Sequence, residues 1–305
     1  MPYTILENLW RRTLNPQTAF SDNNNAWNRE NETLYKMGIS MEDTLKYLYF
    51  EKPDLDSFKA WIAENKKFVA ADDREFIDDV LTKDDLEFWD KNGYVIVKEA
   101  ISKQECEETT QAIWEFLKMS PDNSASWYKP HEDLKGLMLS FFDHAALNKN
   151  RESKRIKKAY EQLYKTNRIF KTIDKVSFNP PETKNFHFKG SPLHWDISLK
   201  MPAPFGLQGL LYLTDCDAHD GAFHCVPGFH KKIESWLKEL SPDENPRSKA
   251  LEVLHPAPVT GNAGDFIIWQ NTLPHCASPN NGKVPRMVQY LTYLPDDYIT
   301  PAEWI

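Results

Sequence analysis

The sequence predicts an α+β fold, in which a helical first half precedes an antiparallel double sheet of jelly-roll type. Two observations favour this class. Helix-capping signals and apolar residues at helical spacing are frequent before Lys171. Short β-rich runs separated by Gly, Pro and Asn follow from that residue onward, as in sandwiches and barrels. With 305 residues, the chain is long enough for one such domain and an appendage.

Residues 1–80 are predicted to form a helical extension packed on the main domain. Ser40 is expected to cap a helix that Pro53 stops. Asp54 then opens a second helix, which carries apolar residues on one side. Before these helices, the Asn-rich stretch 21–32 is typical of a loop.

The main domain is expected to span residues 81–305 and to begin with two capped helices. Thr82 opens the first, and Gly93 is expected to end it because glycine readily adopts the left-handed conformation of a C-terminal cap. Ser102 and Glu105 have the spacing of a capping box and open the second helix. A short β-rich run between the two helices predicts a strand. Six further strands are predicted, over residues 172–178, 193–200, 207–214, 222–226, 265–269 and 286–294.

Charge and composition indicate a protein that acts on small molecules. The formal net charge of −8 argues against the basic face that nucleic-acid binding requires. The four cysteines form neither a CxxC pair nor a dense pattern, which favours reduced thiols over a zinc site or a disulfide framework. No apolar run is long enough to span a membrane, and no export signal opens the chain. We therefore expect a cytoplasmic protein with no membrane or nucleic-acid partner; the oligomeric state is not predicted.

Two imidazoles and one carboxylate form the most informative functional pattern. His194 and Asp196 are two positions apart, so that in a strand both project to one side while Trp195 points away. His275 lies on a later strand. Such a triplet covers one face of an octahedron around iron(II) and leaves three positions for a chelating co-substrate and dioxygen. An isolated pair of this kind is more often a core histidine and a turn carboxylate, so the context decides.

The context is an ordered series of motifs around the triplet. The motifs are Gly221-Ala222-Phe223, Val226-Pro227-Gly228-Phe229-His230, Gly264-Asp265-Phe266, Pro279-Asn280 and Arg286. In order and spacing, they closely resemble the phytanoyl-CoA dioxygenase family of Fe(II)/2-oxoglutarate-dependent oxygenases over about residues 82–298.

The resemblance implies a double-stranded β-helix with helices braced against one sheet. It also implies that His194, Asp196 and His275 hold Fe(II), and that Arg286 grips the distal carboxylate of 2-oxoglutarate. Dioxygen is the remaining co-substrate. The chemistry of Arg286 agrees independently, because a guanidinium can hold a carboxylate through two bonds and stays charged when buried.

Tyr212 is the second residue expected to bind the co-substrate. Alternation along its strand places it on the inward face together with Gln208, so we assign it to the wall of the co-substrate site. Hydroxyl groups such as that of Ser177 are further candidates for this wall.

The implied reaction is hydroxylation of an unidentified small molecule, coupled to decarboxylation of 2-oxoglutarate to succinate. Asp196 favours hydroxylation, or an oxidation that starts with the same hydrogen abstraction, over halogenation, because halogenating relatives carry a small residue there. Two alternatives stay open: a non-catalytic sensor that binds iron and 2-oxoglutarate, and a cupin-like metalloenzyme that does not use 2-oxoglutarate. Arg286 discriminates against the second, which has no use for a buried guanidinium at that position.

Overall fold

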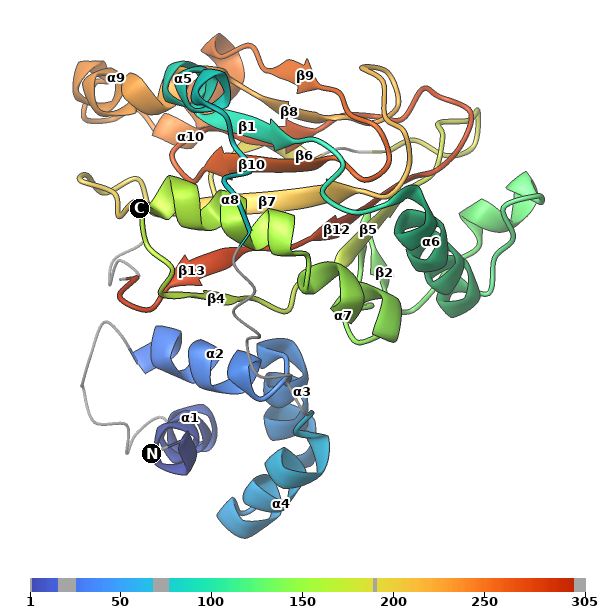
Figure 1. Cartoon of the computed structure of the whole chain (residues 1–305), viewed down its shortest axis with the longest axis vertical. Helices are drawn as coiled ribbons and strands as arrows, with labels where there is room; N and C mark the ends of the chain where they lie inside the picture. The colour runs from blue at the N-terminus through green and yellow to red at the C-terminus, as the bar shows by residue number, and fades with distance from the viewer. Residues whose placement is uncertain (1, 16–25, 68–76, 189–190, 299–305) are drawn as a thin grey trace.

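The computed structural model describes residues 2–15, 26–67, 77–188 and 191–298 (Figure 1). Helices form an N-terminal cluster and also flank a set of antiparallel sheets, which confirms the predicted mixture of helices and antiparallel strands. In the described part of the chain, no helix combines the length and the apolar character needed to cross a membrane. The four cysteines are all free, as expected.

A seven-stranded antiparallel sheet forms the larger wall of the main part of the chain. Its strands lie in the order β1-β10-β7-β12-β5-β3-β2. Their bounds are Tyr94–Val97 for β1, Phe266–Gln270 for β10, Leu207–Tyr212 for β7, Arg286–Tyr290 for β12, Val176–Asn179 for β5, Met138–Leu139 for β3 and Leu134–Lys135 for β2.

A four-stranded antiparallel sheet, in the order β6-β11-β8-β9, forms the opposite wall, and β13 and β4 pair as a separate two-stranded sheet. The bounds are Ser191–His194 for β6, His275–Ala277 for β11, Phe223–Cys225 for β8, Ala257–Val259 for β9, Tyr293–Pro295 for β13 and Ile169–Lys171 for β4.

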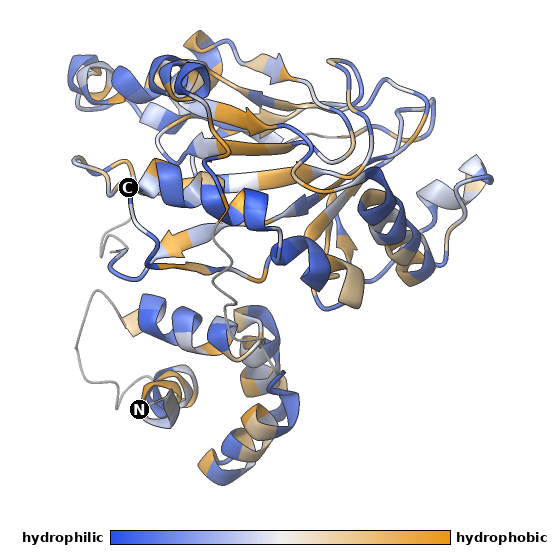
Figure 2. Cartoon of the chain, viewed as in Figure 1, coloured by the Kyte–Doolittle hydropathy of each residue, from blue (hydrophilic) through white to orange (hydrophobic). Residues whose placement is uncertain are grey.

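Alternation along each strand divides the core into two layers. On β10, Phe266 and Ile268 face a layer shared with the helices, whereas Ile267 and Trp269 face the layer between the two sheets. Figure 2 shows apolar strands inside and polar outer faces on the helices. The helices of the first layer are α6 (Lys103–Leu117), α7 (Ala145–Arg151) and α8 (Lys154–Tyr164). The candidate ligands lie on the other side of the sheet, between the two walls.

The helix ends agree with the expected capping signals. Thr82 and Ser102 each form a complete capping box, and Gly93 ends α5 (Lys83–Asn92) with φ of 80°. Ser40 caps α3 (Met41–Glu51), which ends two residues before Pro53 as predicted. The remaining helices of the main part are α9 (Ile233–Glu239) and α10 (Pro246–Val253).

The N-terminal helices share a core of their own. They are α1 (Pro2–Leu14), α2 (Ala26–Lys36), α3 and α4 (Leu55–Asn65). The loop predicted over 21–32 is wrong from Ala26 onward, and residues 21–25 lie outside the described residues. Packing outweighs the low helix propensity of Asn here: Leu34 of α2 is fully buried, and Arg12 of α1 pairs with Glu30, which is 1% exposed.

Two of the six predicted strands were drawn too long. The strand predicted over 193–200 ends at His194. The strand predicted over 286–294 is divided into β12, which pairs with β5 and β7, and β13, which pairs with β4. The other four predictions each correspond to an observed strand within a few residues.

We predict that Gly264→Ala lowers the free energy of unfolding by about 2–4 kcal/mol, measured by urea denaturation. Gly264 has φ of 96°, and an added Cβ would lie 2.5 Å from the backbone oxygen of Ile101, which cannot rotate away. Gly136→Ala is the matched control: φ is 62°, but the space around an added Cβ is open. It should cost only about 1 kcal/mol. Equal losses in the two variants would contradict the close approach.

Candidate functional site

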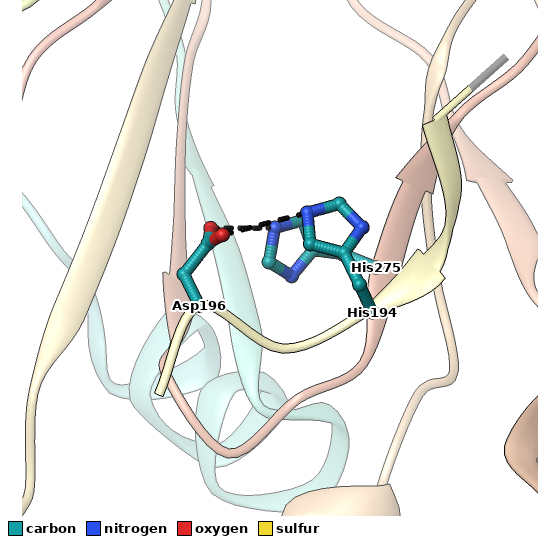
Figure 3. A group of neighbouring side chains, drawn as sticks. All are labelled: His194, Asp196 and His275. Atoms are coloured by element: carbon teal, nitrogen blue, oxygen red, sulfur yellow. Dashed lines mark ion pairs between the residues drawn. The ribbon is translucent and has the colours of Figure 1, made fainter. Parts of the chain in front are cut away.

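His194, Asp196 and His275 converge between the two sheets (Figure 3). Asp196 lies 3.5 Å from His194, measured from Oδ1 to Nε2, and 3.2 Å from His275, measured from Oδ2 to Nε2. One ligand atom from each residue lies within 4.8 Å of the other two. The structure therefore brings together the three side chains that the sequence predicts to converge, at distances that suit a single shared ion.

The pairing of β6 with β11 places the two histidines, which lie opposite each other in the ladder with ring centroids 4.5 Å apart. Asp196 is placed differently from the prediction, because it lies in the bend after β6 and not on the strand. Arg247 of α10 fixes this bend by donating to the carbonyls of Trp195 at 2.9 Å and Ile197 at 2.7 Å. Trp195 points away from the cluster and is buried, as expected.

Backbone carbonyls prepare both imidazoles to bind a metal. Nδ1 of His194 lies 2.7 Å from the Pro192 carbonyl, and Nδ1 of His275 lies 3.2 Å from the Leu273 carbonyl. A carbonyl only accepts, so each Nδ1 carries the proton and each Nε2 keeps its lone pair for a metal. Burial and the neighbouring His275 also lower the pKa of His194, which favours the neutral ring that a metal needs.

Asp196 is held as a carboxylate. Gln208 of β7 donates to its Oδ2 at 2.7 Å, and Gln208 is itself oriented by the indole N–H of Trp269, which donates to Oε1 at 3.0 Å. Burial alone would raise the pKa of Asp196, but in the metal-free cluster a proton on Nε2 of His275, the bond from Gln208 and the neighbouring His194 outweigh it and hold that pKa well below its usual range. A metal bound at Nε2 would take the place of that proton.

Arg286, the first residue of β12, is a buried cation that lines the same cavity as the triplet. Its Nη1 donates to the Ser177 hydroxyl at 3.3 Å. Its Nε is buried and has no hydrogen-bond partner among the described residues. A charged donor left unsatisfied in a cavity wall suits a carboxylate ligand.

Tyr212 lies behind Arg286 and not beside the triplet. Its ring centroid is 5.9 Å from Cζ of Arg286, an arrangement that favours the positive charge. Its hydroxyl donates to the Val259 carbonyl at 2.7 Å and accepts from the Phe223 N–H at 3.0 Å. The hydroxyl is thus committed to the protein, and only the ring is directed toward the cation.

The triplet and Arg286 share one cavity of about 450 Å³, within the range of small-molecule sites. Its wall is mixed, with apolar side chains between the polar ones. The other lining residues are Leu137, Met138, Asp174, Lys175, Ser191, Gln208, Gly209, Phe223, Trp269, Cys276, Ala277, Tyr290 and Thr292.

These donors fit a mononuclear iron(II) centre. Two imidazoles and a carboxylate with adjacent open positions are typical of non-heme iron(II) oxygenases, whereas structural zinc sites are closed by four protein ligands. The unsatisfied Arg286 supplies a second, independent feature that fits a dicarboxylate.

The family profile described as phytanoyl-CoA dioxygenase (PhyH) matches residues 89–288, about two-thirds of the chain. The chain therefore belongs to the phytanoyl-CoA dioxygenase family, a family of Fe(II)/2-oxoglutarate-dependent oxygenases. The resemblance inferred from the motifs is thus confirmed. A protein of Dictyostelium discoideum assigned to the phytanoyl-CoA dioxygenases is 19% identical over 269 residues, covering 72% of this chain and 77% of its own length.

Solved structures share the fold. AviO1 from Streptomyces viridochromogenes superposes with a TM-score of 0.53 at 15% identity, covering 74% of this chain and all of AviO1. HygX from Streptomyces hygroscopicus, solved with nickel and 2-oxoglutarate bound, gives 0.52 at 14% identity, covering 72% of this chain and 90% of HygX. SnoK, a non-heme alpha ketoglutarate dependent carbocyclase from nogalamycin biosynthesis, superposes with a TM-score of 0.52 at 17% identity. The match covers 70% of this chain and 84% of SnoK.

Sequence reasoning overlooked the residues that support the triplet. Gln208 was placed on the inward face but given no role, and Trp269 and Arg247 were given none. For Gln208, its inward position on a strand is a usable signal, because a buried amide needs a hydrogen-bond partner and therefore indicates a polar group nearby. Arg247 had no such signal, because it reaches the site from a helix distant in sequence.

We predict that Gln208→Ala weakens metal binding about tenfold, measured by calorimetric titration with Mn(II), because Asp196 loses the donor that orients it. Trp269→Phe keeps the ring and removes only the donor to Gln208, so its effect should be smaller and in the same direction. Gln270→Ala on β10 is the control, since that side chain accepts from Thr272 and lies outside the cavity wall. Unchanged affinity in Gln208→Ala would count against the supporting role.

Proposed function

We propose that the chain is an Fe(II)/2-oxoglutarate-dependent dioxygenase that hydroxylates a small molecule and couples this to decarboxylation of 2-oxoglutarate to succinate. The observation that carries the proposal is the shared cavity of the His194, Asp196 and His275 cluster and the unsatisfied Arg286. We assign the catalytic fold to a double-stranded β-helix domain over residues 81–305 and treat residues 1–80 as a helical extension.

In this proposal, His194, Asp196 and His275 hold Fe(II) through two Nε2 atoms and a carboxylate oxygen. Arg286 receives the distal carboxylate of 2-oxoglutarate. Bound together, iron, 2-oxoglutarate and dioxygen supply the oxidising chemistry, which is a property of the cofactors. The chain contributes position and electrostatics: carbonyls keep each Nδ1 protonated, and Gln208 fixes the rotation of Asp196.

Tyr212 acts in this proposal through its ring. The ring backs the guanidinium of Arg286 and so helps to hold it in the wall where the co-substrate binds. Because the Tyr212 hydroxyl is bound to Val259 and Phe223, we assign it no direct bond to 2-oxoglutarate.

The partner we propose is a small-molecule substrate, in agreement with the cavity volume and the acidic net charge. Nucleic acid is disfavoured by that charge. The cytoplasmic location expected from the sequence stays a prediction. A cupin-like metalloenzyme that does not use 2-oxoglutarate would have no ligand for the buried cation of Arg286. A sensor would bind iron and 2-oxoglutarate through the same residues but would form no succinate.

We predict that His194→Ala and Asp196→Ala each abolish iron-dependent formation of succinate from 2-oxoglutarate, followed by mass spectrometry. Each change removes one of only three protein ligands. His224→Ala is the matched control, because His224 lies on the neighbouring strand β8, bonds to the Ala222 carbonyl and lies outside the cavity wall. Turnover that survives in either ligand variant would refute the proposed metal site.

We predict that Arg286→Met raises the dissociation constant for 2-oxoglutarate about 100-fold and leaves Mn(II) affinity unchanged, because a buried charge-assisted bond is lost. The matched ligand is 2-oxobutyrate, which has the same keto acid end but no distal carboxylate. Its affinity should stay within about threefold of the original value. Equal losses for both ligands would show that Arg286 does not recognise the distal carboxylate.

A further inference from the structure

A second cavity, of about 560 Å³, lies where the N-terminal helices meet the main part of the chain. Aromatic and aliphatic side chains make up most of its wall, and we call it the aromatic groove. It is lined by Trp27, Tyr35, Met41, Glu42, Leu45, Lys46, Tyr49, Phe50, Phe142, Ile173, Asp174 and Lys175. Helices α2 and α3, which supply its first eight residues, lie beside the β4 side of the sheets (Figure 1).

The aromatic groove presents apolar surface to solvent. Phe50 is 79% exposed, Tyr49 is 60% exposed and Trp27 is 41% exposed. Single exposed aromatic residues need no explanation, but three around one concave surface are typical of a binding site. The stability of the N-terminal helices does not require them, since the core of these helices consists of other residues.

The aromatic groove borders the catalytic cavity. Asp174 and Lys175, which lead into β5, line both cavities. Lys175 is held at this boundary by Glu42 of α3, with Nζ and Oε2 2.6 Å apart. Glu42 also accepts a hydrogen bond from the Ser140 hydroxyl at 3.4 Å, next to the strand that carries Met138 of the catalytic cavity. The N-terminal helices therefore help to shape the rim of the catalytic cavity.

The charges at this boundary indicate what kind of group the groove accepts. Glu42 pairs with both Lys175 and Lys46, so the ionic groups of the wall largely neutralise one another. Lys46 also lies 5.8 Å from the centroid of the Phe142 ring. An uncharged aromatic or aliphatic group meets matching surface here, whereas a free charge finds its potential partners already engaged.

We propose that the aromatic groove binds the uncharged, apolar part of the substrate, while the carbon to be oxidised extends past Lys175 toward the metal ligands. This inference rests on the proposed function and specifies its substrate class: an elongated small molecule with an aromatic or aliphatic portion remote from the oxidised carbon. Binding of that portion would use the N-terminal helices as part of the substrate site.

The test uses N-phenyl-1-naphthylamine, an uncharged probe that fluoresces in apolar surroundings, with the full chain loaded with Mn(II) and 2-oxoglutarate. We expect saturable binding of one probe per chain. A Tyr49→Ser/Phe50→Ser double variant should raise its dissociation constant at least tenfold, and both positions are exposed enough for the fold to persist. Tyr3→Ser is the control, because Tyr3 is 46% exposed on α1 and lies outside the groove.

Proton NMR of the same samples tests whether the groove leads to the metal. Mn(II) should broaden the signals of the bound probe, and no broadening should occur with His194→Ala, which binds the probe but not the metal. The inference would be overturned if the double variant bound the probe as tightly as the unaltered chain. A dimer that forms through the aromatic groove and excludes the probe would also overturn it. So would bound probe without broadening while EPR shows Mn(II) in place. If EPR instead finds Mn(II) unbound, the proposed function fails, and the titration still decides whether the groove binds apolar groups.

Discussion

The alignment of His194 opposite His275 in the β6–β11 ladder is the constraint on which the site depends. Residues directly opposite in an antiparallel pair have their side chains close together on one face, so the register of two short strands fixes the distance between the two proposed imidazole ligands. A shift of one residue would turn one imidazole to the other face. Strand register does not position Asp196, the third proposed ligand, because it lies beyond the strand. Arg247 holds its backbone instead, by donating to the carbonyls of the residues on either side.

The two faces of the seven-stranded sheet have different roles: one forms apolar core and the other faces the catalytic cavity. The face toward α6, α7 and α8 buries a large apolar layer, which stabilises the fold by removing apolar surface from water. The opposite face carries Gln208 and Arg286 toward the catalytic cavity, where buried polar groups reduce stability unless each has a partner. Among the described residues, Arg286 is the cation of this cavity left incompletely bonded. That unsatisfied donor is best explained as a group prepared for a ligand.

Much of the fold was predictable because it rests on local signals. Capping boxes at Thr82 and Ser102 act within one helical turn, and strand alternation is read over a few residues. The ligand triplet was predictable because its ligands have distinctive side chains and a known family order. The helix at Ala26 was missed because tertiary packing decided it. Arg247 and the aromatic groove depend on contacts between distant segments, which spacing along one sequence does not reveal.

The central claim is that one cavity holds iron through the triplet and 2-oxoglutarate through Arg286. Anaerobic titration of the Fe(II)-loaded protein with 2-oxoglutarate, followed by visible absorption, tests it most directly. We expect a charge-transfer band that saturates at one 2-oxoglutarate per chain and is absent from Asp196→Ala. Separate binding of iron and 2-oxoglutarate without any such band would contradict it, because the two ligands would then occupy different sites.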